Sequence, residues 1–187
     1  MSYTKLSATS PAVYSAPRWA VLWFIISTLL VAWDTGYVLL RPRSMRGGDL
    51  FWLWAPYELY AKTDLVYSRL WLDAHNGFTS AQALMNIVES ILNLVTLALF
   101  AQKSPVAVLA GFTATVMTTS KTVLYWLVDH QEGPNGWGAT GHNSLRDWVV
   151  LFAIPNGAWI IVPGILSVIF GRQIARSLRV AAKTKTL

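Results

Sequence analysis

Four long apolar stretches alternate with polar connections along the chain. They cover roughly residues 19–40, 81–100, 106–128 and 148–170. Each is close to the ~20 residues that a helix needs to cross ~30 Å of hydrocarbon. The runs are continuous rather than alternating, which favours helices over the strands of a membrane barrel. The pattern therefore predicts an all-α integral membrane protein, a single domain of residues 1–187 built as a four-transmembrane-helix bundle.

The connections between these stretches differ in length and character. Residues 102–105 leave room only for a tight turn, which predicts an antiparallel hairpin of the second and third spans. A glycine-rich polar loop from His130 to Leu145 joins the third span to the fourth. The longest connection, residues 41–78, begins as a loop and becomes aromatic and amphipathic over residues 50–60. A proline and a glutamate within it argue against a fifth crossing, so we expect an interfacial aromatic segment that lies in the membrane interface or tucks over the bundle.

Composition supports the membrane interpretation and excludes several other classes of protein. Hydrophobic residues make up 54% of the chain, and many of its 10 Trp and 7 Tyr stand at the ends of apolar runs, where such rings settle at a membrane–water interface. The net charge of +6 forms no basic patch between aromatic residues, so we expect no nucleic-acid partner. The absence of Cys excludes disulfides, thiolate metal sites and cysteine nucleophiles. The 3 His lie in predicted loops without metal-ligand spacing, so we expect no metal and no cofactor.

Basic residues predict how the chain sits in its membrane. With four spans, both termini and the turn at residues 102–105 share one side, which holds eight Lys or Arg against six on the other. Because cytosolic segments carry the excess of basic residues, we expect cytosolic termini and a basic cytosolic tail over residues 171–187. Lys183 and Lys185 resemble the dilysine retrieval signal of the endoplasmic reticulum membrane. The first apolar run is too long for a signal peptide and no cleavage site closes it.

Ionisable and amide side chains stand inside the predicted spans, where each is costly unless it faces the bundle interior. They are Asp34 in the first span; Asn86, Glu89 and Asn93 in the second; Lys121 and Tyr125 in the third; and Asn156 with Trp159 in the fourth. The spacing of three and four residues in the second span places its polar group on one helix face. Threonines 115, 118, 119 and 122 of the third span are expected to be packing residues, since small hydroxyl side chains let helices approach closely.

The carboxyl groups are the candidate catalytic residues. Burial disfavours the charged form of a carboxyl group, so a carboxyl in an apolar pocket can act as an acid near neutral pH. Glu89, in mid-span, is the candidate acid, and Asp34 is the second acid–base group or else an interfacial anchor. The face of Trp159 could stabilise a developing cation. Such a set suits migration of a double bond, or cyclisation, through a carbocation.

Lys121 is the third candidate catalytic residue, either as a counter-ion to one of the carboxylates or as a group that polarises a substrate oxygen. The remaining polar residues have binding roles in this hypothesis. Asn86 and Asn156 would orient the substrate, although Asn156 could equally repair the kink at the preceding proline. The further candidate binding residues are Asn93, Tyr125 and Trp33.

Short motifs follow one another between residues 54 and 164. They are WAPYELYAKTDLVY (54–67), FT (78–79), VES (88–90), TVLYW (122–126), DHQEG (129–133), GH (141–142) and NGAWIIVPG (156–164). In this order they resemble motifs of the emopamil-binding protein family, the EXPERA-domain group that holds sterol Δ8–Δ7 isomerases and the sigma-2 receptor. The resemblance covers roughly residues 30–170. It implies a helical bundle in the endoplasmic reticulum membrane and a lipophilic substrate, and homodimers occur in the family.

The resemblance also implies roles for individual residues. The glutamate on the isomerases' catalytic helix corresponds to Glu89, and their first-helix glutamate corresponds to Asp34. The asparagine and tryptophan of their last helix correspond to Asn156 and Trp159.

Two departures set the chain apart from the sterol isomerases. Leu30 stands where the isomerases have a histidine, and Thr122, beside Lys121, stands where they have an aspartate. These differences make the chain similar to divergent fungal members of the family, some of which act in secondary metabolism.

Three functional hypotheses follow. The first is an intramembrane isomerase or cyclase that acts by acid–base chemistry on a sterol-, terpenoid- or polyketide-like substrate. The second is a membrane protein of the sigma-2 type that binds a sterol or amine without turnover. The third is a trafficking protein that recognises a membrane partner through the aromatic segment at residues 51–60. In all three hypotheses the bundle is surrounded by membrane lipid.

Overall fold

The computed structural model of the chain describes residues 16–134 and 136–184, which form helices and connecting turns without strands. The four long helices are α1 (Arg18–Leu39), α4 (Phe78–Ala101), α5 (Ala107–Gln131) and α7 (Ile154–Thr184). A short helix α6 (Leu145–Asp147) and a π-helical turn (Trp148–Ala153) lead directly into α7. Four helical segments are long and apolar enough to cross a membrane, which confirms the predicted fold class.

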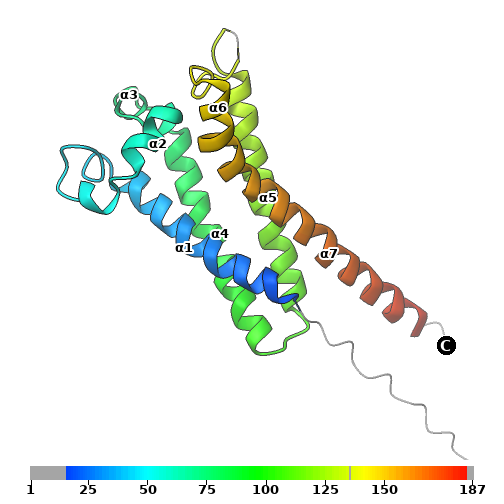
Figure 1. Cartoon of the computed structure of the whole chain (residues 1–187). Coiled ribbons are helices and arrows are strands. Elements are labelled where there is room, and N and C mark those ends of the chain that lie inside the picture. The colour runs from blue at the N-terminus through cyan, green and yellow to red at the C-terminus, as the bar shows by residue number, and fades with distance from the viewer. Residues whose placement is uncertain (1–15, 135, 185–187) are drawn as a thin grey trace, which may run out of the picture.

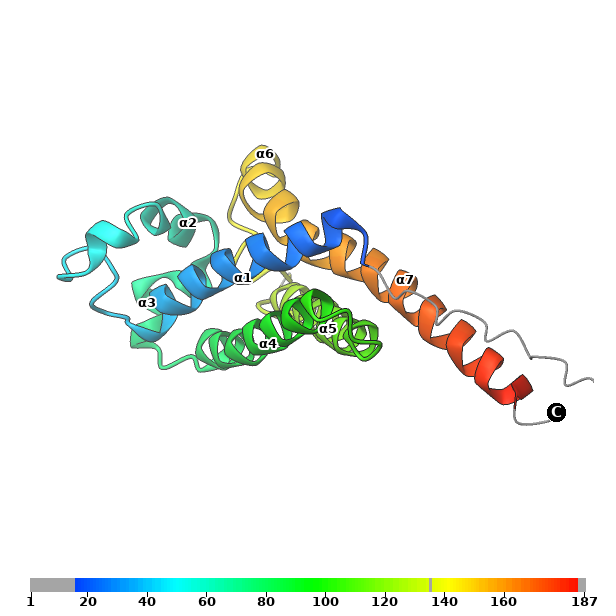
Figure 2. The same cartoon turned by 90° about the horizontal axis from the view of Figure 1, so that it is seen from below.

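The helices pack as two connected pairs. α4 and α5 form the predicted antiparallel hairpin, α1 packs on α4, and α7 packs on α5 (Figure 1). The start of α1, the α4–α5 turn and the C-terminal part of α7 lie at one end of the bundle, the terminal end. The short helices between α1 and α4 lie with α6 at the opposite end, the loop end. From below, α1 runs along α4 while α7 extends beyond the bundle (Figure 2).

Side chains are distributed in the manner expected of a protein solvated by lipid. Between 17% and 39% of each span's apolar window is buried, so most of these apolar side chains face outward. The buried face of α5 instead carries threonines, including Thr115, Thr118 and Thr122. The hydroxyls of Thr115 and Thr122 donate to carbonyls one turn earlier, and Ser167 of α7 donates to the Thr115 hydroxyl at 3.0 Å. This matches the packing role predicted for the threonines.

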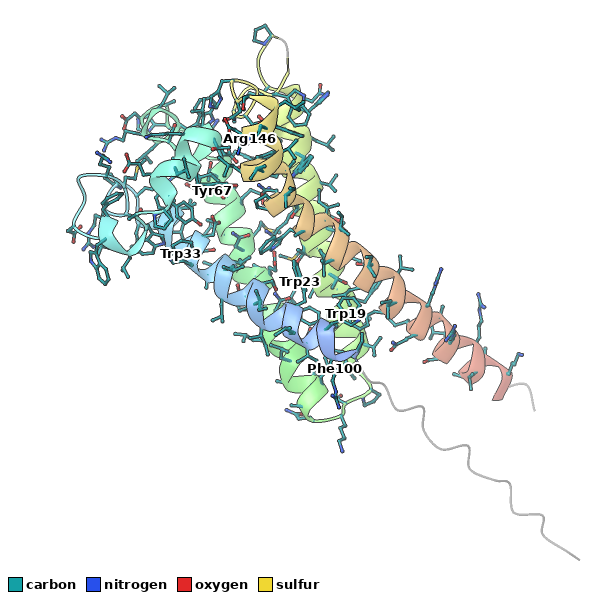
Figure 3. The ribbon with its side chains drawn as sticks, viewed as in Figure 1. Trp19, Trp23, Trp33, Tyr67, Phe100 and Arg146 are labelled. Atoms are coloured by element: carbon teal, nitrogen blue, oxygen red, sulfur yellow. The ribbon has the colours of Figure 1, made fainter. Side chains whose placement is uncertain are left out.

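Aromatic rings join α1 to α7. The rings of Trp23 and Trp159 meet edge to face with centroids 5.2 Å apart, and Phe24 stacks with Phe170 at 6.4 Å. Tyr67, Trp33 and Trp23 follow one another from the loop end toward the terminal end (Figure 3). These contacts hold α1 against α7.

The segment between α1 and α4 folds into four short helices that tuck over the loop end. They are η1 (Phe51–Leu53), α2 (Tyr57–Thr63), η2 (Leu65–Tyr67) and α3 (Arg69–Asp73). The Trp54 indole nitrogen donates to the carbonyl of Trp33 at 2.8 Å, and Trp54 is buried. Trp52 and Leu59 point outward and are exposed. Of the two arrangements predicted for this segment, the structure has the one in which it covers the bundle.

Two predicted boundaries are wrong. α5 continues to Gln131, so His130 lies in its last helical turn rather than in a loop. α7 continues beyond residue 170 to Thr184, because residues 172–184 are mostly strong helix formers without Pro or Gly. The described part of the basic tail is therefore helical. Lys185 of the dilysine pair and Lys5 lie outside the described residues.

Candidate functional site

A cavity of about 400 Å³ lies in the loop-end half of the bundle, between α1, α2, α4, α5 and α7. Most of the polar residues singled out in the spans line it. They are Trp33, Asp34, Asn86, Lys121, Tyr125, Asn156 and Trp159. Residues from four spans thus meet around one space, although they are far apart in the sequence.

Asp34 is the carboxyl group on the cavity wall. It stands on α1, half-buried, one turn before the helix ends. Its Oδ1 accepts a hydrogen bond from the Tyr57 hydroxyl at 2.8 Å, and its Oδ2 accepts one from the Asn86 amide at 3.2 Å. Two neutral donors therefore hold this carboxyl group, and no cation touches it directly among the described residues.

Lys121 connects α5 to the polar face of α4. Its Nζ donates to Oδ1 of Asn86 and lies 3.0 Å from Oε2 of Glu89. A polar chain therefore runs from Tyr57 through Asp34, Asn86 and Lys121 to Glu89. This network contains two carboxyl groups, Asp34 and Glu89, and one ammonium group, Lys121, so its acids outnumber its cations by one.

Glu89 lies behind Lys121 rather than at the cavity. Its side chain is 1% exposed, and it is not among the residues that line the cavity. Neither of its carboxylate oxygens accepts an aligned hydrogen bond from the described residues, so the ion pair with Lys121 is its polar contact. Asn93, one turn further along α4, is buried and also lies away from the cavity. Glu89, the acid predicted from the sequence, is therefore linked to the cavity through its ion pair with Lys121 and does not line it.

Three tyrosines of the aromatic segment also line the cavity, and sequence reasoning did not place them there. They are Tyr57, Tyr60 and Tyr67. Burial raises the pKa of each of these hydroxyls well above its usual range, so they are neutral hydrogen-bonding groups. Their clustering within one short stretch is the signal in the sequence, but that stretch could lie either in the membrane interface or over the bundle, so it did not indicate the site. Gln82 of α4, which donates to the carbonyl of Lys121 at 3.2 Å, was likewise missed.

Asn156 bonds both to its own helix and to the cavity wall. Its amide donates to the carbonyl of Phe152 at 3.0 Å, one turn back in the π-helical region before Pro155. The same amide donates to the Tyr60 hydroxyl at 3.1 Å, at the cavity wall. Irregular turns of this kind are common where a proline interrupts the helical hydrogen bonds. One turn later, Trp159 presents a buried indole N–H that has no partner among the described residues.

Two further acidic residues organise the loop end. Asp64 is 1% exposed and accepts a hydrogen bond from the Tyr125 hydroxyl. Burial raises the pKa of Asp64 to about 7, although the hydrogen bond from Tyr125 opposes this rise. Asp129 accepts the backbone amides of residues 139 and 140 at 2.8 and 3.2 Å. Neither carboxyl group is among the cavity-lining residues, and both tie loops to α5.

No family model and no curated protein matches the chain. The chemistry of the site therefore has to be inferred from its own residues.

Proposed function

We propose that the chain is an intramembrane isomerase or cyclase that moves a proton on a lipophilic substrate held in the cavity, with Asp34 as the acid–base group. The observation that carries the proposal is the position of Asp34. A carboxyl group at a cavity wall, held by the neutral donors Tyr57 and Asn86, can serve both as carboxylate and as acid. Proton transfer of this kind needs no bound cofactor.

The surroundings of the cavity support a lipophilic substrate. Leu30 and Trp33 on α1 and Pro155 on α7 line the cavity and are exposed, and the adjoining surfaces of both helices are apolar. A molecule dissolved in the bilayer would reach the cavity at this wall. The volume of about 400 Å³ falls in the range of roughly 300–1,000 Å³ that is typical of pockets for drug-sized ligands.

The other residues would bind and orient the substrate. Asn156 and the Tyr60 hydroxyl offer polar contacts, and the ring of Trp159 offers an aromatic face. Glu89 would be the counter-ion that keeps Lys121 charged and in place. This is a change from the acid role that the sequence indicated for it.

The same residues support membership of the emopamil-binding protein family. Asp34, Asn156 and Trp159 correspond to three site positions of the isomerases, and they line one cavity. We propose on this basis a divergent member of the family, in the endoplasmic reticulum membrane, that acts in secondary metabolism.

A binding protein without turnover is the second candidate. Asp34 lies beside the rings of Trp33 and Tyr57, whose centroids are 5.0 Å apart. A carboxylate next to aromatic faces is the chemistry that recognises an ammonium group. An amine ligand would also balance the excess of carboxyl groups in the network.

Mass spectrometry of lipophilic compounds separates the two candidates. Cells that express the wild type, Asp34→Asn or the matched exposed control Asp73→Asn receive one extract of sterol and terpenoid precursors. An enzyme should produce a compound of unchanged mass and shifted retention with the wild type and with Asp73→Asn, but not with Asp34→Asn. Unchanged compounds in all three, with one amine that co-purifies with the wild type, would establish the binding protein instead.

A further inference from the structure

Lys121 places a positive charge on the wall of the cavity. An ammonium group has three hydrogen-bond donors. Among the described residues its side-chain partners are Asn86, which lies beside it on the cavity wall, and Glu89, which lies behind it. One donor is therefore left for a bound molecule.

This charge decides which reactive intermediate the cavity can stabilise. A carbocation formed beside a fixed ammonium group would be repelled, because charges of the same sign interact strongly in a site from which water is excluded. An oxyanion formed at the same place would be attracted, and preorganised donors at a developing negative charge are an effective catalytic device. Once Asp34 has taken up a proton it is neutral, and Lys121 is then the charged group among the residues that line the cavity. At that stage the cavity suits an anionic intermediate better than the carbocation expected from the sequence.

We propose that the substrate is a ketone or aldehyde with a nearby carbon–carbon double bond, and that Lys121 holds the oxygen of its enolate while Asp34 carries the proton. This inference rests on the proposed function and names the substrate class of the same site. Lys121 and Asp34 would both be catalytic residues. Glu89 would be a positioning residue that acts through Lys121.

The reaction balances without any further reactant. The Asp34 carboxylate removes a proton from the carbon between the carbonyl group and the double bond. The electron pair of that C–H bond forms a new carbon–carbon double bond, and the carbonyl electron pair moves to the oxygen, where Lys121 donates to it. The oxygen then re-forms the carbonyl group, and the far alkene carbon takes the proton back from Asp34. The double bond has moved by one position, and no atom has been gained or lost.

Asn86 gives this mechanism its geometry. Its amide nitrogen donates to Asp34 at 3.2 Å, and its carbonyl oxygen accepts from Lys121. The proton carrier and the oxygen-binding group are therefore only one carboxamide apart along the same wall. A substrate of this class needs such a separation, because its oxygen and its acidic carbon are also close neighbours.

The test compares two halves of one lipophilic extract from the organism that carries the gene. One half is reduced with borohydride, which turns ketones and aldehydes into alcohols and leaves isolated double bonds intact. Membranes that contain the wild-type protein should convert a compound in the untreated half and none in the reduced half. Equal conversion in the reduced half would overturn the enolate inference and leave the proposed isomerase standing. No conversion in either half would overturn both.

A matched pair of double variants tests the role of Lys121 itself. Lys121→Met with Glu89→Gln removes the ammonium group and its buried partner together, so no unpaired charge is left behind. Conversion should fall by about 10²- to 10³-fold, the effect expected on losing one donor to an oxyanion. Arg69→Met with Asp73→Asn removes an exposed pair, 2.9 Å apart, and should leave conversion unchanged. A folded Lys121 variant with the wild-type rate would contradict the inference, and if that variant does not fold, the borohydride comparison still decides it.

Discussion

The two carboxyl groups near Lys121 differ in whether they reach the cavity. Asp34 and Glu89 both belong to the network of Lys121, but only Asp34 faces the cavity. We expect Asp34→Asn to lower the conversion rate by about 10²- to 10⁴-fold with little loss of stability, the range for a lost acid–base group. Glu89→Gln should lower stability instead, by roughly 2–4 kcal/mol, because a mostly buried ammonium group loses its counter-ion. Initial rates and thermal unfolding in detergent measure both effects. Because Glu89 holds Lys121 in place, its loss should also slow conversion. Only a loss of rate as large as that of Asp34→Asn, in a fully stable Glu89→Gln variant, would return Glu89 to the acid role.

Asp64 should make the stability of the protein depend on pH. Burial raises the pKa of Asp64 to about 7, against an ordinary value of ~3.9 in the unfolded chain. Between these two values the folded protein holds a proton that the unfolded chain has lost. The stabilisation is therefore complete below about pH 4 and is lost as the pH rises to about 7, a change of about 4 kcal/mol.

The variant Asp64→Asn tests this prediction because it removes the titrating group and keeps a neutral partner for Tyr125. The melting temperature of the wild type should be lower at about pH 8 than at about pH 5. The difference should be much smaller for Asp64→Asn. The exposed Asp73→Asn serves as the control and should behave as the wild type does. An equal fall in all three proteins would show that another group is responsible.

Some residues of the site could be predicted from the sequence and others could not, for a physical reason. A polar side chain inside an apolar run is conspicuous, so Asp34, Asn86 and Lys121 could be identified. Which carboxyl group faces the cavity depends on how α1 and α4 are rotated against each other. The local sequence of either helix does not determine this rotation. Tyr57 reaches Asp34 across 23 residues, a contact set by the folding of the whole connecting segment.

Among the elements, the contact between α1 and the aromatic segment positions the site. A Cβ atom added to Gly36 would lie 2.7 Å from the ring of Trp54, so only glycine allows this approach. Gly36→Ala should displace Trp54, weaken its bond to the Trp33 carbonyl and shift α2, which carries Tyr57. We expect a loss of about 1–3 kcal/mol, as for an overpacked core, and slower conversion.

Gly164→Ala provides the matched control for this prediction. Gly164 also lies within a helix, but an added Cβ atom would meet nothing within 4 Å. The substitution should leave conversion unchanged and raise stability by about 0.5–1 kcal/mol, since alanine favours a helix over glycine. Thermal unfolding of the two variants should therefore move in opposite directions. Identical melting curves would show that Trp54 does not pack against α1.

The long helices could be predicted from the sequence because each is a continuous apolar run. The end of α7 could not, because the helix continues past the apolar run over residues 171–184, most of which have high helix propensity. The π-helical turn before Pro155 could not be predicted from hydrophobic periodicity either, because it lies within a continuous apolar stretch. That turn matters for the site, because it leads into Asn156, whose amide bonds to the carbonyl of Phe152 within the turn and to the hydroxyl of Tyr60.

On the scale of the whole molecule, the exterior is apolar along the spans and the ends differ in charge. Arg172, Arg176 and Arg179 are exposed on the part of α7 that continues past the bundle. Basic residues at the end of a span favour the cytosolic face and anionic lipid. The α4–α5 turn lies at the same end (Figure 1), which is why we expect both to be cytosolic.

The lack of Cys makes this orientation directly measurable, because a single introduced cysteine is then the only thiol. Gln102→Cys and Arg179→Cys lie at the terminal end, and Ala74→Cys lies at the loop end; all three positions are exposed. In sealed microsomes, a membrane-impermeant maleimide should label the first two at once and Ala74→Cys only after detergent is added. The reverse pattern would place the termini in the lumen, since the bundle would be inverted. Different labelling of Gln102→Cys and Arg179→Cys would contradict the four-span arrangement itself, because an even number of crossings must separate the two positions.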